Sequence, residues 1–307
     1  MKIVECVPNF SEGRDQNKIK AIAESLQSFP AVQLLDYSAD TDHNRSVFTF
    51  LGEAQDILQA ALAAAEKALD LIDMRKQEGV HPRLGAVDVV PFIPFQDATM
   101  EDAIRLARLF GRKINQRYGI PVYFYSKAAL KPDRIALANI RRGGYESLPE
   151  KMTNPSNAPD LGGPQFDARW GATVVGARRP LVAYNINLQS GDLKLAQKLA
   201  SQIREKNGGL KNVQAIGVHL KSRNLVQVSM NLTDCDTTPI KTVYELVETL
   251  AGKQDIEILE SELIGLAPQS AFAGTTPERL KLKNFDAGRL LEMHLRQFAR
   301  LDRPFRS

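Results

Sequence analysis

Alternating apolar and polar residues in the first hundred positions predict strands and helices in a regular succession. Side chains of a strand alternate with a period of two residues, whereas apolar residues on a helix recur every three or four. The predicted strands are residues 2–8, 32–37, 45–52 and 87–93, and the predicted helices are residues 16–28 and 53–72. The order is therefore strand, helix, strand, strand, helix, strand, which is the split βαβ, ferredoxin-like arrangement.

The second half of the chain repeats this order without strong sequence identity to the first half. Its predicted strands are residues 181–188, 213–220, 225–232 and 256–266, and its predicted helices are residues 192–206 and 240–250. We infer a duplicated arrangement from the element order alone. The expected fold class is α+β, with two ferredoxin-like subdomains, residues 1–178 and 179–307, whose sheets face each other across a ligand cleft.

A long loop separates the two sets of elements. A helix at residues 101–118 and a short strand at residues 122–125 extend the first subdomain, and residues 153–170 then form a loop rich in proline and glycine. Long loops without secondary structure tend to be functional or disordered. Because this loop carries Phe166 and the only tryptophan, Trp170, we expect it to be ordered and to face a ligand.

Two further expectations concern a proline and the C-terminal tail. Pro91 cannot donate a hydrogen bond to a neighbouring strand, so strand 87–93 is expected at a sheet edge or with a bulge. An edge position agrees with the fourth strand of a ferredoxin-like sheet. Residues 278–300 are expected to form a helix, with four leucines as its apolar positions.

The composition is that of a globular protein without a membrane span. Of the 307 residues, 43% are hydrophobic and 25% are charged, and no apolar run approaches the roughly 18 residues that a spanning helix needs. The N-terminus enters a strand at once and shows no signal-peptide pattern. Cys6 and Cys235 are too few for a disulfide framework or a zinc cage, so a cytoplasmic protein is expected.

The charge of the chain excludes little. A formal net charge of +4 and a pI near 9.0 mildly favour anionic ligands, because a positive potential raises the local concentration of anions. The alternative is that so small an excess has no functional meaning. The basic residues form no stripe with interleaved aromatic residues, so neither a nucleic-acid partner nor a membrane partner is expected.

The segment from residue 78 to residue 94 carries the most distinctive chemistry. His81 and Arg83 lie between two glycines, directly before an apolar strand, and Pro82 favours an extended conformation at His81. The pKa of imidazole lies near neutrality, so His81 can accept and donate a proton there. From these residues alone, a structural histidine in a turn is an equally good interpretation.

Two polar turns precede this segment. Asn9 and Ser11 follow the first strand, where turn and capping chemistry is the favoured interpretation. Asp42, Asn44 and Arg45 lie in a loop with a histidine, and a solvated hairpin loop is the alternative to a binding role there. The chain shows no convincing set of three or four metal ligands. The remaining histidines, at positions 219 and 294, are interpreted as structural.

Segments that span nearly the whole chain, in the expected order, resemble the formiminotransferase family. This family comprises glutamate formimidoyltransferase and the transferase half of formiminotransferase-cyclodeaminase. The most distinctive segments are residues 4–13 (VECVPNFSEG) and 81–89 (HPRLGAVDV). The others are residues 44–45, 47–50, 71–74, 158–160, 170–173, 176–178, 185–188, 213–217, 227–229, 231–232 and 242–245.

The resemblance implies a fold, a reaction and a cellular setting. The family fold has two ferredoxin-like subdomains. The reaction moves the formimino group of N-formimino-L-glutamate to N5 of tetrahydrofolate, which serves as co-substrate without a metal. The products are 5-formiminotetrahydrofolate and L-glutamate, in histidine degradation and one-carbon metabolism. A cytoplasmic homodimer is expected from the family.

The resemblance also implies the site residues. The family's catalytic histidine falls on His81. The implied substrate-binding residues are Asn9, Asp42, Asn44, Arg45 and Arg83. The implied folate-binding residues are Gly162, Gly163, Pro164, Gln165, Phe166, Asp167, Ala168, Arg169, Trp170 and Gly171. Both substrates are polyanions, so Arg45, Arg83 and Arg169 are expected to bind carboxylates.

Two departures from the family pattern and three rival functions stay open. Vertebrate relatives carry a glutamate where this chain has Val80, and the chain ends at Ser307 with no cyclodeaminase half. The rival enzymes are a glutamate formyltransferase and an enzyme that metabolises 5-formyltetrahydrofolate, since formyl and formimino groups differ by one atom. A rival of a different class is a folate-binding regulatory protein.

His81→Ala tests the catalytic interpretation. If His81 is the general acid and base, the variant keeps its fold and binds folate while kcat falls by roughly 10²- to 10⁴-fold. His81→Asn recovers little of that loss, and both variants lose a limb of the pH–rate profile near neutrality. A structural histidine predicts a lower Tm with near-normal turnover instead. Thermal stability and kcat measured on one preparation separate the two, and a stable variant with full activity would make the segment scaffold.

Overall fold

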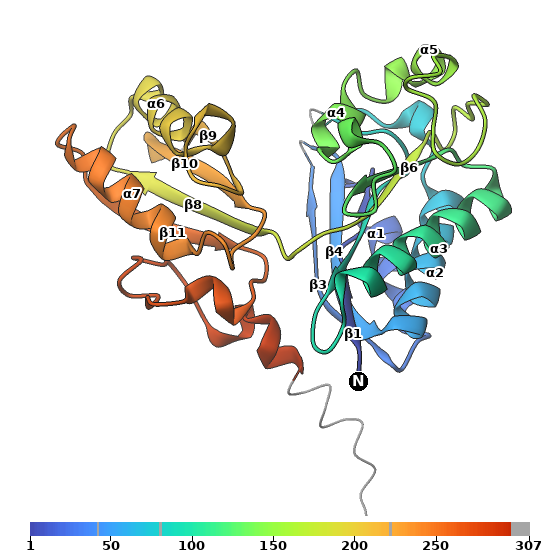
Figure 1. Ribbon diagram of the computed structural model, residues 1–307, viewed down its shortest axis with the longest axis horizontal. Helices are drawn as coiled ribbons and strands as arrows, with labels where there is room; N and C mark the ends of the chain where they lie inside the picture. Colours follow the sequence, from blue (N-terminus) through green and yellow to red (C-terminus); the bar gives the residue numbers. More distant parts are fainter. Residues whose placement is uncertain (42, 80–81, 221–222, 296–307) are drawn as a thin grey trace, which may run out of the picture. The chain divides into compact units, whose positions relative to one another are not determined.

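The computed structural model describes residues 1–41, 43–79, 82–220 and 223–295 (Figure 1). The chain divides into two compact units, Met1–Arg178 and Arg179–Ser307. Each unit has its own β-sheet and its own hydrophobic core. The expected α+β class is confirmed. No helix within the described residues is long and apolar enough to span a membrane.

The first unit is built on a seven-stranded sheet. Its strands are β1 (Ile3–Cys6), β2 (Asn9–Phe10), β3 (Val32–Asp40), β4 (Arg45–Glu53), β5 (Val87–Pro94), β6 (Val122–Ser126) and β7 (Thr173–Ala177). Strands β1 and β2 both pair with β4 on one side and with β5 on the other, and β3 pairs with β4. All of these pairs are antiparallel, whereas β7 joins β5 and β6 through parallel pairs.

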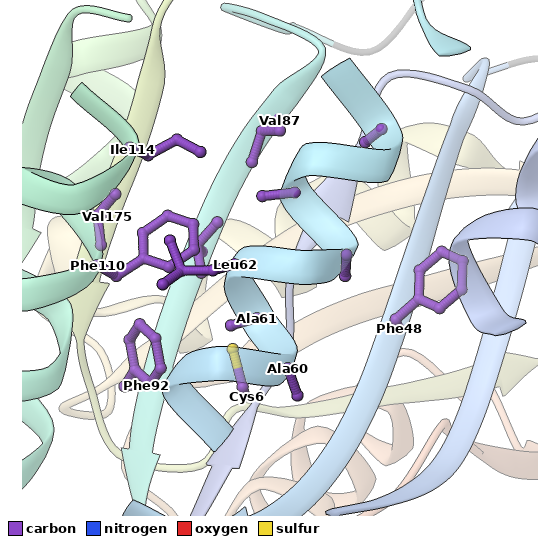
Figure 2. Close-up of a cluster of buried hydrophobic side chains, with 14 of the residues drawn as sticks. Cys6, Phe48, Ala60, Ala61, Leu62, Val87, Phe92, Phe110, Ile114 and Val175 are labelled. Atoms are coloured by element: carbon purple, nitrogen blue, oxygen red, sulfur yellow. The ribbon is translucent and has the colours of Figure 1, made fainter. Parts of the chain in front are cut away.

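Three helices cover one face of this sheet. They are α1 (Gln16–Leu26), α2 (Ala54–Leu71) and α3 (Met100–Tyr118). Helix α3 begins at a capping box of Thr99 and Asp102, which satisfies backbone N–H groups at its first turn. Figure 2 shows Ala60, Ala61 and Leu62 of α2 in the core cluster that also holds Cys6 and Phe92 of the sheet. The small side chains of α2 let its backbone lie close to the strands.

The opposite face of the sheet is covered over β5, β7 and β6 by the segment that follows β6. This segment contains α4 (Leu137–Arg141) and α5 (Leu148–Thr153). Ile140 and Leu148 pack there against Val89, Tyr123 and Val174 in a smaller apolar cluster. Successive side chains of a strand point to opposite faces, so Glu5, between Val4 and Cys6 of the helix-side core, lies on this second face.

The expected edge position of strand β5 is wrong, because β7 pairs with it on the side away from β1 and β2. Pro91 is tolerated inside the sheet because a side-chain N–H group replaces the backbone N–H that proline lacks. Val7 N–H donates to Pro91 O (3.3 Å), while the Val7 carbonyl accepts from Asn9 Nδ2 (2.9 Å) in place of the N–H that residue 91 lacks. A bulge does occur in β5, at Asp88, where Asn9 and Phe10 pair with Val89 and Val87.

The second unit has a four-stranded antiparallel sheet in the order β11-β8-β10-β9. Its strands are β8 (Val182–Leu188), β9 (Val213–Leu220), β10 (Leu225–Leu232) and β11 (Ile258–Ile264), and its helices are α6 (Leu193–Ile203) and α7 (Ile240–Gly252). The predicted succession of strand, helix, strand, strand, helix, strand is confirmed. The apolar residues of both helices and of the strands form one core.

The expected single helix at residues 278–300 is wrong for residues 278–290. Turns and a short 3₁₀ helix (Ala287–Arg289) occupy this part, and Lys281 and Asn284 have positive φ angles that interrupt a helix. Leu282 and Leu290 form isolated bridges beside β11 and after it. The segment is therefore held along the sheet edge. Residues 291–295 are helical, and residues 296–300 lie outside the described residues.

Glu5 generates a pH-dependent prediction. It is buried between Leu51 of β4 and Ile93 of β5, and burial raises its pKa from 4.5 to about 7, with Arg178 acting in the opposite direction. Between these two pH values the folded chain keeps a proton that the unfolded chain loses. The free energy of unfolding therefore falls as the pH rises through this window, by at most about 3 kcal/mol.

Glu5→Gln is expected to remove this dependence. Its unfolding free energy should match that of the wild type near pH 4.5 and exceed it by up to about 3 kcal/mol at pH 8. Urea unfolding at the two pH values measures the difference. The exposed Glu24 serves as control, since Glu24→Gln should change stability by less than about 0.5 kcal/mol. Equal stability of Glu5→Gln and wild type at pH 8 would contradict the assignment.

Candidate active site

Three polar segments that are far apart in the sequence meet at one end of the first sheet. In the turn after β2, Ser11 N–H donates to Ala86 O (3.0 Å) and Ser11 Oγ donates to Gly85 O (2.8 Å). Asn44, which begins the turn into β4, accepts from Gly13 N–H (2.9 Å) and donates to Glu78 O (3.0 Å). The two turns therefore hold the chain just before and just after residues 80 and 81.

The side-chain amide of Gln77 connects these segments. Its Nε2 donates to Glu12 Oε2 (3.1 Å), its Oε1 accepts from Asn44 Nδ2, and its main-chain carbonyl accepts from Arg83 Nη2 (2.6 Å). Gln77, Glu12 and Asn44 are all buried. We call these three residues the Gln77 network. Sequence reasoning missed Gln77, because nothing in a polar residue between a helix and a loop indicates burial.

Glu12 is the charged member of the Gln77 network. Its Oε1 accepts from the N–H groups of Arg14 and Asp15 (3.0 Å each), and its Oε2 also accepts from Lys18 Nζ (3.2 Å). Burial opposes ionisation of Glu12, but the two backbone donors and Lys18 outweigh it and lower the pKa of this carboxyl. Glu12 is therefore ionised, and its oxygens accept hydrogen bonds from Arg14 N–H, Asp15 N–H, Lys18 and Gln77.

Two glycines allow the segments to approach this closely. A Cβ atom on Gly13 would lie 2.1 Å from Asp40 O, and a Cβ atom on Gly79 would lie 2.3 Å from His43 O. Both distances are far below van der Waals contact, so any side chain at either position would push the loop before β4 away. Gly13 and Gly79 are therefore required because each packs directly against the backbone of another segment.

The structure describes most of the predicted site residues, but it does not describe all of them. His81, Val80 and Asp42 lie outside the described residues, so their assignments stay predictions. Asn44 belongs to the Gln77 network, and Asn9 lies on β2 between Val47 and Val89. The binding roles assigned to these residues are not tested by their positions.

Arg83 has a structural role that the sequence did not indicate. Its Nη2 donates to the carbonyl of Gln77 and to Glu146 Oε1 (2.9 Å), and its guanidinium lies over the ring of Tyr145, 5.7 Å from the ring centre. Only 13% of its side chain is exposed. These contacts already orient the guanidinium of Arg83. Its contact with a substrate carboxylate stays a prediction.

The predicted folate loop is anchored at both ends. At its start, Leu161 forms a bridge with Val122. At its end, Gly171 forms a bridge with Gly85, and Trp170 Nε1 donates to Leu69 O (3.0 Å). Residues 162–165 between these anchors are exposed. The loop and the segment that follows His81 in the sequence are therefore neighbours, although 86 positions separate Gly85 from Gly171.

Arg169 and Trp170 hold this loop to the C-terminus of α2. Arg169 Nη2 donates to Asp70 O (2.9 Å), and the ring of Trp170 packs edge-on against Tyr118. Cations near the last carbonyl groups of a helix are stabilising. The guanidinium of Arg169 contacts this helix end and lies over the ring of Trp170, 5.8 Å from the ring centre, and the predicted carboxylate contact stays a prediction.

A second polar cluster, which the sequence did not reveal, joins the turn after His81 to α4. Asp88 Oδ1 accepts from Leu84 N–H (2.9 Å), and its Oδ2 accepts from Arg141 Nη2. Asp88 is 1% exposed. The sequence could have indicated this cluster, because Asp88 is a single carboxylate within an apolar strand and a buried charge needs a partner. Arg141 comes from a polar stretch that gave no signal.

Arg45 belongs to this second cluster. Burial lowers its pKa to about 10, and the like charge of Arg141 acts in the same direction, whereas Asp88 and Asp40 oppose it. Among the described residues, no group of three histidine, cysteine, aspartate or glutamate side chains is placed to hold a metal ion.

Comparison with known families identifies the fold family of both units. Residues 3–178 match the model of the N-terminal subdomain of the formiminotransferase domain, and residues 183–278 match the model of the formiminotransferase domain. The chain belongs to the formiminotransferase family. The first match covers nearly all of the first unit, and the second covers most of the second unit.

Relatives of full length support this membership. A Thermoplasma acidophilum protein named glutamate formimidoyltransferase is 43% identical over 98% of this chain and 100% of its own length. One of that name from Streptococcus pyogenes is 41% identical over 96% of this chain and 99% of its own. The formimidoyltransferase-cyclodeaminase of Gallus gallus is 44% identical over 88% of this chain but only 51% of its own length.

Gln77→Leu tests whether the Gln77 network holds the three polar segments together. The substitution leaves Glu12 Oε2 and Asn44 Nδ2 each with one fewer partner in a buried site, so the free energy of unfolding should fall by roughly 1–3 kcal/mol. Gln77→Glu should cost more at pH 8 than at pH 5, because it places a second carboxylate against Glu12. Urea unfolding measures both effects.

Gln59 provides the control, since it is an exposed residue of α2. Gln59→Leu should change stability by less than about 0.5 kcal/mol. If Gln77→Leu proves as stable as Gln59→Leu, the three segments are held by other contacts.

Proposed function

We propose that the chain is a glutamate formimidoyltransferase. It transfers the formimino group of N-formimino-L-glutamate to N5 of tetrahydrofolate and releases L-glutamate and 5-formiminotetrahydrofolate. The observation that carries this proposal is the match, over 96–98% of the chain, to two relatives of that name. The matched family models over both units agree with it.

The reaction requires one proton to leave N5 and another to reach the departing nitrogen. N5 attacks the formimino carbon and gives a tetrahedral intermediate, whose C–N bond to glutamate then breaks. In our proposal His81 takes the proton from N5 and delivers one to the glutamate nitrogen, as an imidazole with a pKa near neutrality can do. Support comes from the fixed chain on both sides of residue 81, which the Gln77 network and Ser11 hold.

The substrates are proposed to bind on the segments that meet there. Tetrahydrofolate is placed at the loop 162–171, supported by the bridge between Gly171 and Gly85. The amino-acid substrate is placed among the turns that carry the predicted binding residues. These residues are Asn9, Asp42, Asn44, Arg45 and Arg83.

The finer architecture belongs to the same proposal. We propose that residues 1–178 and 179–307 are two ferredoxin-like subdomains. The strand order β5-β1-β4-β3 within the first sheet and the order β11-β8-β10-β9 in the second support this, since both follow the succession 4-1-3-2. A ligand cleft between the sheets, a cytoplasmic homodimer, a place in histidine degradation and a reaction without a metal stay predictions.

A turnover assay with alternative donors tests the function. With tetrahydrofolate as acceptor, kcat/KM for N-formimino-L-glutamate should exceed that for N-formyl-L-glutamate roughly 10-fold or more, because a site built for an N–H group discriminates against an oxygen. A preference for the formyl donor would favour the glutamate formyltransferase. Consumption of 5-formyltetrahydrofolate alone would favour an enzyme that metabolises this compound. Folate binding without any turnover would favour a regulatory protein.

A further inference from the structure

The side chain of Tyr145 carries an inference that deepens the proposed function and rests on it. Tyr145 is the first residue of a short 3₁₀ helix between α4 and α5. It directly follows Gly143 and Gly144, which both have positive φ angles, a conformation that glycine adopts at little cost. The two glycines turn the chain after α4. Tyr145 thereby contacts both the loop 162–171 and Arg83.

The loop is the first partner of Tyr145. The Tyr145 hydroxyl donates to Ala168 O, and the ring packs against that of Phe166, with 5.5 Å between the ring centres. Burial raises the pKa of Tyr145 above its ordinary value, although Arg83 opposes the shift. The hydroxyl therefore keeps its proton at neutral pH and acts as the donor. These contacts hold Phe166 and Ala168, which precede the anchor at the end of the loop.

Arg83 is the second partner of Tyr145. Its guanidinium lies over the Tyr145 ring, 5.7 Å from the ring centre, and its Nη2 donates to Gln77 O (2.6 Å) and to Glu146 Oε1 (2.9 Å). The side chain of Glu146 is 65% exposed, and an ion pair with so exposed a group restrains its partner only weakly. The ring of Tyr145 and the Gln77 carbonyl are therefore the contacts that set the direction of the guanidinium.

The contacts of Tyr145 complement the backbone contacts between the same two segments. Ala172 N–H donates to Leu84 O (3.0 Å), and Gly171 forms a bridge with Gly85, so the backbone joins the segments at the C-terminal end of the loop. Tyr145 joins them through side chains earlier in the loop. A loop that is held in its binding conformation before the ligand arrives loses less conformational entropy on binding. Tyr145 can therefore affect the affinity for a ligand that it does not touch.

We propose that Tyr145 is a positioning residue for both substrates. Its hydroxyl holds the loop 162–171 in the conformation that binds tetrahydrofolate, and its ring aligns Arg83 with a carboxylate of the amino-acid substrate. Tyr145 acts through Ala168 and Arg83, and it takes no part in the proton transfers assigned to His81. The two roles depend on different parts of one side chain, so substitutions that remove one part at a time separate them.

Tyr145→Phe removes the hydroxyl and keeps the ring. Binding of 5-formyltetrahydrofolate, measured by calorimetry, should weaken roughly 3- to 10-fold, the worth of one hydrogen bond. The amide hydrogens of residues 168–171 should exchange faster by a similar factor, because the Trp170 and Gly171 N–H groups, which donate to Asp167 O, exchange when the loop opens. The KM for N-formimino-L-glutamate should stay within about twofold of the wild-type value, since the ring beneath Arg83 remains.

Tyr145→Leu removes the ring as well. It should weaken binding of 5-formyltetrahydrofolate at least as much as Tyr145→Phe does. It should also raise the KM for N-formimino-L-glutamate roughly 3- to 10-fold, because Arg83 loses the aromatic surface that aligns it. In an Arg83→Ala background the same substitution should add little to this KM, since the group that Tyr145 aligns is absent. Tyr37, an exposed residue of β3, is the matched control, and Tyr37→Phe should behave as the wild type does.

The outcomes separate this inference from the proposed function. A folded Tyr145→Phe variant with wild-type binding and wild-type exchange of the loop overturns the inference, even if its Tm is lower and formimino transfer is observed. Absence of 5-formyltetrahydrofolate binding by the wild type overturns it as well. An unchanged KM for N-formimino-L-glutamate in folded Tyr145→Leu overturns the role assigned to the ring, and if Tyr145→Leu does not fold, Tyr145→Phe decides. Conversely, weaker binding and faster exchange in Tyr145→Phe uphold the role of the hydroxyl even if the wild type transfers no formimino group and the proposed function fails.

Discussion

The hydrogen bonds of one buried amide, that of Gln77, determine how the rest of the candidate active site is arranged. Glu12, Asn44 and Arg83 come from three different parts of the chain, and each contacts Gln77. In a region of low dielectric such bonds are strong, and a missing partner is costly. The network is satisfied only in one arrangement of the three segments. The chain on either side of residues 80–81, at Glu78 and at Gly85, is therefore held by contacts with Asn44 and Ser11.

The two faces of the first sheet differ in the residues that they bury. The face under α1, α2 and α3 carries an apolar core, which supplies most of the driving force for folding. On the other face, α4 and α5 cover only the strands β5, β7 and β6, and polar residues such as Glu5, Asn9 and Asp88 stay buried beside that cover. Burying such groups opposes folding unless they are paired, as Asp88 is by Arg141 and by Leu84 N–H.

Sequence-based prediction was wrong where contacts with residues far away in the chain determine the backbone conformation. Pro91 reads as an edge residue, but β7 pairs with β5 from more than 80 positions away, and Asn9 satisfies the carbonyl that the proline leaves without a donor. The leucines of the tail have helical spacing, yet Leu280 and Leu291 are buried without a continuous helix between them. In both cases the pattern was correct about burial and wrong about the backbone.

The sequence by itself determined most of the succession of strands and helices, the α+β class and the segments that resemble the formiminotransferase family, but it did not predict strands β2 and β7. Periodicity and turn chemistry are set by residues within a few positions of one another, so they can be recognised without a structure. The tertiary structure alone decided that Gln77 contacts Glu12 and that Arg141 contacts Asp88. Each of these pairs joins side chains more than 50 positions apart, and such contacts depend on how the elements pack, which no local pattern encodes.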